Sequence, residues 1–188
     1  MTRLALACLT GLSLLVPPQS PLTVTDLDGH ASTPLVAAAG GVNLLIFVSS
    51  DCPISARYSP EINRIIHDYQ SKGVRAWLVY AEPKVTAATV RANLREYHAG
   101  ISIPAVIDTG FRLTDAVGAS VTPEAAVYTP AGRAYRGRID DLYEVIGQSK
   151  RTADHHDLRD ALDAALAGRP VTPAVTKAIG CFIERTIK

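Results

Sequence analysis

A short apolar segment that leads directly into a helical pattern constrains the fold of this chain more than any other feature of its sequence. The segment runs from Val42 to Val48, follows Gly40-Gly41 and has the length of a buried strand. Pro53 is typical of the first turn of a helix, and Ser50 or Asp51 is the expected N-cap. Apolar side chains then recur at intervals of three and four residues, at Ile54, Tyr58, Ile62, Ile65, Ile66 and Tyr69. The sequence therefore predicts a buried strand joined by a short loop to an amphipathic helix.

Cys52 lies in the loop between this strand and this helix. Free backbone N–H groups and the positive end of the helix dipole stabilise negative charge at a helix start, so they favour the thiolate form of a cysteine there. The carboxyl group of Asp51 acts in the opposite direction. We interpret Cys52 as a candidate nucleophile, and the alternative is a buried, unreactive cysteine.

Strand and helix patterns alternate in the first part of the chain and give way to a hairpin and a last helix. The predicted strands cover 22–24, 42–48, 74–80, 105–107, 125–128 and 133–139, and the predicted helices cover 53–72, 86–98, 111–117 and 157–167. This order is typical of an α/β fold with a mixed central β-sheet flanked by helices. We expect one domain over 21–168 and a C-terminal tail over 169–188 that carries Cys181.

The first twenty residues have the pattern of a secretory signal peptide. Arg3 precedes an apolar run from Leu4 to Val16, and Pro17-Pro18 then interrupts the run. The alternative is an uncleaved membrane anchor. After residue 20 we expect no stable membrane insertion, because no later segment is long and apolar enough to span a bilayer. The predicted location is therefore periplasmic or otherwise extracytoplasmic, with 1–20 removed.

Removal of this leader would leave two cysteines, Cys52 and Cys181. An even number of cysteines in an exported chain permits a disulfide. Three roles stay open for Cys181: a partner that resolves an intermediate formed on Cys52, one half of a fixed structural disulfide, or a free thiol.

Charge and motif content argue against several other classes of function. The formal net charge is +1 and no run of lysine or arginine occurs, so we expect no nucleic-acid partner. His155-His156 is not a typical metal motif, because neighbouring helical positions point about 100° apart. The chain also has no glycine-rich phosphate-binding loop. We expect neither a cofactor nor a metal ion.

Two motifs resemble those of the thioredoxin-like superfamily, and within it the redoxin or peroxiredoxin-like branch. They are Asp51-Cys52-Pro53 at the strand–helix junction and Val121-Thr122-Pro123 before the first strand of the hairpin. The resemblance covers roughly 21–168 and implies a thioredoxin-like fold. It also implies that Pro123 is cis and packs beside the thiol, and that Thr122 offers backbone groups to a substrate. The segment Ile179-Gly180-Cys181 resembles the ending of certain peroxiredoxin-like proteins.

The chain also departs from the patterns of these families. Thioredoxins have a second cysteine three residues after the first, and Ser55 stands there, so an intramolecular disulfide has to use Cys181. Ser55 is a candidate hydrogen-bond donor to the Cys52 thiolate, or else a solvated serine. Peroxiredoxins have a threonine three residues before the reactive cysteine and a proline seven before it. Ser49 and Leu45 stand at those positions.

Together these observations predict an exported thiol-disulfide oxidoreductase. Its nucleophile is Cys52, its resolving residue is Cys181, and Pro123 and Thr122 border the substrate. Its partner is a protein thiol or disulfide that serves as electron donor or substrate. The first alternative is a peroxiredoxin-like thiol peroxidase that reduces hydroperoxides. The second is not an enzyme but a periplasmic copper carrier that uses Cys52, Cys181 and a histidine.

Overall fold

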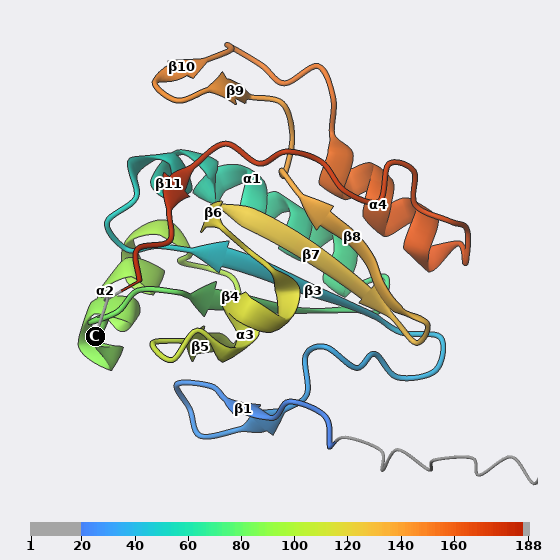
Figure 1. The fold of residues 1–188 in the computed structure, drawn as a ribbon, viewed down its shortest axis with the longest axis horizontal. Helices are drawn as coiled ribbons and strands as arrows, with labels where there is room; N and C mark the ends of the chain where they lie inside the picture. Colours follow the sequence, from blue (N-terminus) through green and yellow to red (C-terminus); the bar gives the residue numbers. More distant parts are fainter. Residues whose placement is uncertain (1–19, 186–188) are drawn as a thin grey trace, which may run out of the picture.

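A five-stranded mixed sheet forms the centre of the molecule (Figure 1). The computed structural model describes residues 20–185, so the predicted leader at 1–20 lies outside the described residues except for its last one. In spatial order the strands are β5 (Ala105–Ile107), β4 (Val74–Tyr80), β3 (Val42–Val48), β7 (Glu124–Thr129) and β8 (Gly132–Gly137). The first three run parallel, whereas β7 is antiparallel to β3 and β8 is antiparallel to β7. The predicted α/β fold with a mixed sheet is confirmed.

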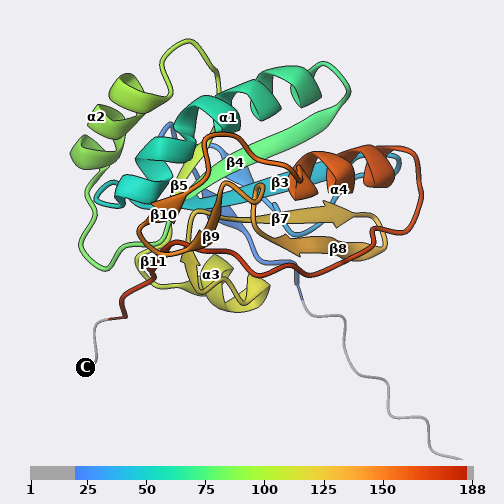
Figure 2. The ribbon, with the colours of Figure 1, turned by 90° about the horizontal axis from the view of Figure 1, so that it is seen from above.

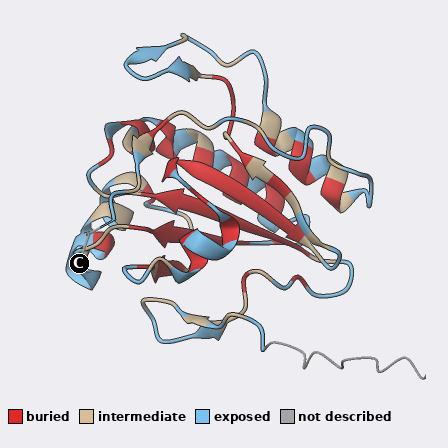
Figure 3. Cartoon of the chain, in the orientation of Figure 1, coloured by how far each residue is buried: buried red, intermediate tan, exposed pale blue. Residues whose placement is uncertain are grey.

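Helices cover both faces of this sheet (Figure 2). One face carries α1 (Pro53–Gln70), α2 (Ala87–Tyr97) and α4 (Asp157–Leu166), and the other carries α3 (Arg112–Val117). Every residue of β3 is buried, and the sheet lies at the centre of the buried region in Figure 3. Leu44 and Ile46 pack into the cluster beneath α1, while Leu45 and Phe47 pack into the cluster beneath α3. Burial on both faces explains why β3 is apolar without alternation.

The predicted N-cap of α1 is wrong. Cys52 is the N-cap, and its sulfur accepts a hydrogen bond from the backbone N–H of Ser55 at 3.4 Å. Ser50 does not cap the helix because both its N–H and its hydroxyl donate to the carboxylate of Glu82. Pro53 occupies the first turn as predicted. Cys52 is therefore part of the helix start itself.

The remaining predicted elements are present within a few residues of their expected bounds, and three short pairings add to them. Two are hairpins, formed by β1 (Val24–Thr25) with β2 (Ala31–Ser32) and by β9 (Tyr143–Val145) with β10 (Gln148–Ser149). The third joins β6 (Val121–Thr122) to β11 (Cys181–Phe182). Among residues 20–185, no helix has the length and apolar character needed to cross a membrane.

The C-terminal tail returns to the body of the protein. We call residues 169–185 the strap. It leaves α4, runs beside β8 and reaches the end of the sheet near the start of α1 (Figure 1). There, β11 pairs antiparallel to β6, with Cys181 opposite Thr122. The pairing places Cys181 beside the loop that precedes Pro123.

A buried histidine makes the stability of this fold dependent on pH. His98 is 4% exposed, and its Nδ1–H donates to the side-chain oxygen of Asn63 at 2.7 Å, because the Asn63 amide donates to the Tyr97 carbonyl. Burial lowers the pKa of His98 from 6.5 to about 4. Between these two pH values the unfolded chain binds a proton that the folded chain does not.

Acidification is therefore expected to destabilise the protein through this residue. Stability falls progressively as the pH is lowered from 6.5 to about 4, by about 3 kcal/mol in total. Urea unfolding at several pH values across this range measures the slope of the free energy of unfolding against pH. The variant His98→Gln keeps a hydrogen-bond donor but does not titrate, so it should show a clearly flatter slope. Equal slopes in the two proteins would contradict this role of His98.

Candidate active site

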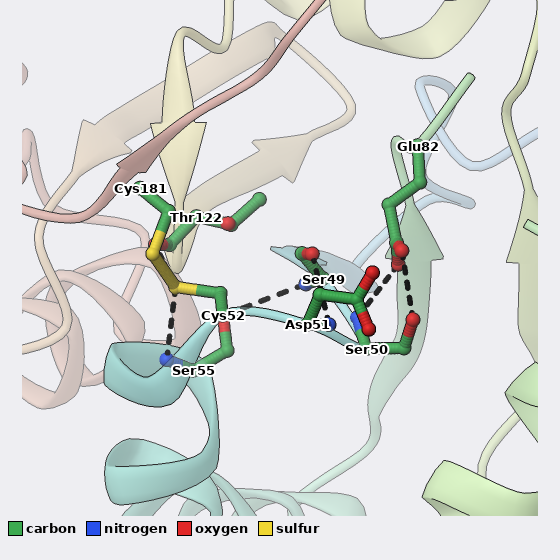
Figure 4. The surroundings of a disulfide bond; sticks show 8 residues. All are labelled: Ser49, Ser50, Asp51, Cys52, Ser55, Glu82, Thr122 and Cys181. Carbon is green, nitrogen blue, oxygen red and sulfur yellow. Dashed lines mark hydrogen bonds between the residues drawn. A yellow bond between two sulfur atoms is a disulfide. The ribbon is translucent and has the colours of Figure 1, made fainter. Parts of the chain in front are cut away.

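A disulfide joins Cys52 at the start of α1 to Cys181 in the strap (Figure 4). The two Cα atoms are 6.0 Å apart, within the usual range for disulfides. Cys52 is only 3% exposed, whereas Cys181 is half-buried. The sequence left open whether these two cysteines pair; they do, and in this form Cys181 is not a free thiol.

Two backbone groups contact the sulfur of Cys52 and have opposite effects on its ionisation. The Ser55 N–H points at the sulfur and stabilises a thiolate. The carbonyl oxygen of Thr122 lies 3.2 Å from the same sulfur. A disulfide sulfur has no proton to donate, but a reduced thiol would donate to this oxygen, which favours the protonated form. The sulfur of Cys52 is therefore held between the first turn of α1 and the loop before Pro123.

Ser55 contributes its backbone N–H to the sulfur. Its hydroxyl accepts a hydrogen bond from the N–H of Ser49 at 3.5 Å. The predicted hydroxyl donation to sulfur is therefore replaced, in the disulfide form, by backbone donation. The hydroxyl instead ties the end of β3 to the first turn of α1, which fixes the loop that carries Cys52.

The peptide bond between Thr122 and Pro123 is cis, as the resemblance implied. Thr122 and Pro123 are both buried, and the Thr122 carbonyl faces the disulfide. The structure therefore brings Cys52, Cys181 and Thr122 together, at the edge where β3 ends and α1 begins (Figure 4). Pro123 follows Thr122 directly. The backbone of Thr122, which was expected to face a substrate, pairs with Cys181 instead.

Glu124, which the sequence did not single out, holds the loop before the cis-proline. Its carboxylate accepts hydrogen bonds from the N–H groups of Ser120 at 2.9 Å and Val121 at 3.4 Å, and it lies 3.4 Å from the Arg136 guanidinium. It is 4% exposed. Because a buried carboxylate requires such partners, Glu124 and Arg136 fix the position of the segment that carries Thr122.

A cavity of about 330 Å³ opens beside the disulfide. Its lining includes Ser49, Asp51, Cys52, Glu82, Thr122 and Cys181. Glu82 accepts hydrogen bonds from the N–H and hydroxyl of Ser50, at 2.6 and 2.7 Å. Sequence reasoning missed Glu82, although its place just after β4 was a usable signal. The ends of neighbouring parallel strands lie at one edge of a sheet, so Glu82 and Cys52 had to be close.

No protein-family model matches the chain, and no curated protein sequence does. Solved structures do match. A hypothetical protein from Sinorhizobium meliloti is 25% identical with a TM-score of 0.73, and the match covers 90% of this chain and 93% of that one. An uncharacterised conserved protein from Geobacillus kaustophilus is 23% identical with a TM-score of 0.76 and 90% coverage of both chains.

A third match is a secreted disulfide oxidoreductase from Mycobacterium tuberculosis. It is 14% identical with a TM-score of 0.51, and the match covers 78% of this chain and 95% of that one. At this level of identity the likeness concerns the fold alone. Together with the mixed sheet, the cis-proline loop and the cysteine at the start of α1, these matches establish that the chain has the thioredoxin-like fold.

Proposed function

We propose that this protein is a thiol-disulfide oxidoreductase in which Cys52 is the nucleophile and Cys181 resolves the intermediate. One observation carries the proposal. The disulfide joins a buried cysteine at a helix start to a cysteine in the strap, beside the cis-proline of a thioredoxin-like fold. A helix start stabilises the thiolate that disulfide exchange requires. The strap supplies the second sulfur that the helix itself lacks, since Ser55 occupies that position.

The proposed reaction has two exchange steps. In the first, the Cys52 thiolate attacks one sulfur of a protein disulfide, and the other sulfur of that disulfide leaves as a thiolate. In the second, the Cys181 thiolate attacks the Cys52 sulfur of the mixed disulfide and releases the partner's second thiol. The partner gains two electrons and the Cys52–Cys181 bond forms. A thiol protein that supplies two electrons then restores both cysteines, while Thr122 and Pro123 border the reacting sulfurs.

The same proposal places the protein outside the cytoplasm, in the periplasm or an equivalent compartment. It rests on the leader-like sequence of 1–20 and on a disulfide between the two cysteines of the described chain. In this organisation, 21–168 is the thioredoxin-like domain and 169–188 is the tail. Intact mass of the exported protein tests the assignment, because an uncleaved chain would contradict a signal peptide.

A thiol peroxidase is the second candidate, and one observation favours it. Ser49 and Cys52 line the same cavity, which is large enough for a small hydroperoxide. The Ser49 oxygen accepts from the Asp51 N–H at 3.3 Å, so its own proton is available to a peroxide oxygen. The copper carrier has no such support. Within residues 20–185, no group of three histidine, cysteine or acidic side chains is arranged to hold a metal ion.

A turnover assay distinguishes these functions. With dithiothreitol as donor, the protein is expected to accelerate reduction of insulin disulfides roughly tenfold or more over the variant Cys52→Ser. A parallel assay replaces insulin with hydrogen peroxide. Equal insulin reduction by the two proteins would contradict the proposal, and Cys52-dependent peroxide consumption in its place would favour the peroxidase.

A further inference from the structure

The strap is held to the body of the protein by backbone hydrogen bonds in two places. Near its middle, the N–H of Arg136 donates to the Ala174 carbonyl and the N–H of Thr176 donates to the Arg136 carbonyl, both at 3.0 Å. Near its end, the N–H of Ile183 donates to the Ser120 carbonyl at 3.0 Å, next to the β11–β6 pairing. None of these bonds involves the disulfide.

Side chains strengthen both attachments. The Thr176 hydroxyl accepts from the N–H of Arg138 at 3.1 Å and forms a hydrogen bond with the Tyr135 hydroxyl at 2.5 Å. At the far end, Arg185 lies 2.6 Å from the carboxylate of Asp115. None of these side-chain contacts involves the sulfur–sulfur bond either.

Gly180 brings the strap close to the backbone of the cis-proline loop. It is buried, and a Cβ atom added to it would lie less than 3.0 Å from both the carbonyl oxygen and the carbonyl carbon of Thr122. The Pro123 nitrogen would lie 3.2 Å away. These are backbone atoms of a buried loop, so they cannot rotate aside as a flexible side chain would. Any larger residue at position 180 therefore has to lift the strap, and with it Cys181.

We infer that Gly180 is the positioning residue for Cys181, and that it keeps the strap docked on β6 when the disulfide is reduced. The approach of Gly180 to Thr122 sets the distance of Cys181 from Cys52 and so the effective concentration of its thiol. The effect of this positioning on turnover rests on the proposed function. The positioning itself does not rest on that function, because it is measured by the equilibrium between the dithiol and disulfide forms of the protein.

A docked strap also defines how a partner approaches. Cys181 is paired with Thr122, so this edge of β6 is occupied and a partner strand cannot pair there. The cavity beside Ser49 and Glu82 remains as the open approach to the two sulfurs. The partner sulfur therefore enters through this cavity, with the strap in place.

The equilibrium with glutathione tests the inference. Protein is equilibrated in buffers of reduced and oxidised glutathione, and the fraction of disulfide is read by alkylation and mass. Gly180→Ala is expected to lower the equilibrium constant for disulfide formation at least about tenfold, which is about 30 mV for a two-electron couple. Gly110→Ala is the matched control, because only the Arg112 Cγ, at 4.0 Å, lies near its added Cβ. Its constant should stay within about twofold of the wild type.

A second variant keeps the test decisive if Gly180→Ala folds poorly. Thr176→Val removes the hydroxyl that holds the middle of the strap, and it leaves Gly180 and both cysteines unchanged. It should lower the equilibrium constant for disulfide formation by roughly threefold, since one of several contacts that hold the strap is lost. Unchanged constants in both variants would overturn the positioning role.

Hydrogen exchange tests whether the strap remains docked without the bond. In Cys181→Ser, the amide of Ile183 should stay protected, and adding Gly180→Ala should remove the protection. Rapid exchange of this amide in Cys181→Ser would overturn docking. Both experiments read the strap directly, so a protein that fails the insulin assay yet shows these effects would lose the proposed function and keep this inference.

Discussion

Replacing Cys181 with serine is expected to end the reaction after a single step, with the partner left bound to Cys52. The first exchange needs only Cys52 and the helix start, which this substitution leaves intact. The second exchange needs the strap sulfur, and no other described cysteine is present to replace it. Steady-state turnover should therefore fall by on the order of a thousandfold, while the first step remains within a few-fold of the wild type.

Cys52→Ser is the matched variant, because it should abolish the first step as well. Rapid mixing with a disulfide, followed by an acid quench and peptide mass, reads both variants. A stable adduct on Cys52 in Cys181→Ser, with none on Cys181 in Cys52→Ser, is the expected pair of results. Undiminished turnover in Cys181→Ser would remove the resolving role from Cys181.

Breaking the disulfide is expected to cost much of the protein's conformational stability. The bond joins residues separated by 129 positions and therefore closes a loop across nearly the whole fold. The loss of chain entropy in the unfolded state gives a stabilisation of roughly 5 kcal/mol. The strap's own hydrogen bonds remain after reduction, so little native structure should be lost with the bond.

Urea unfolding of the oxidised protein and of the double variant Cys52→Ser/Cys181→Ser measures this difference. The double variant avoids reductant and so permits identical conditions for both proteins. We expect a large fall in the midpoint with little change in the slope against urea concentration. A difference below about 1 kcal/mol would show that the loop is already restricted in the unfolded chain.

This stabilisation bears on the second role considered for Cys181, one half of a fixed structural disulfide. A disulfide that stabilises the fold is itself stabilised by the fold, because the folding equilibrium and the equilibrium of disulfide formation are linked. A structural bond should resist mild reductant in the native protein, whereas a bond that cycles should be reduced by dithiothreitol without unfolding. The half-buried position of Cys181 leaves one sulfur within reach of a donor.

The middle of the central sheet was predictable because β3 and β4 are largely buried on both faces. Both are mainly apolar segments that follow a glycine, and their predicted limits match those observed. The cis bond before Pro123 followed from the resemblance, since spacing alone gives no indication of it. Sequence reasoning therefore found both the loop before Pro123 and the strand that leads to Cys52.

The details of the site depended on contacts that no local pattern encodes. Ser50 was expected to cap α1, but Glu82, 32 positions further along the chain, takes both of its donors. β11 has only two residues and no periodicity, and it exists because Gly180 permits a close approach to Thr122. The β9–β10 hairpin likewise has strands of only three and two residues, which are too short to give a periodic signal.

The most direct test of the proposed roles of Cys52 and Cys181 starts from the reduced protein. It follows the state of both cysteines over time after mixing with one equivalent of oxidised glutathione. A second arm uses one equivalent of hydrogen peroxide, and an alkylating agent stops each reaction before peptide mapping. We predict a glutathione adduct on Cys52 in the first arm, replaced by the Cys52–Cys181 disulfide within seconds. If both thiols in that arm stay open to alkylation for many minutes, Cys52 is not the nucleophile of disulfide exchange and the proposed function is wrong.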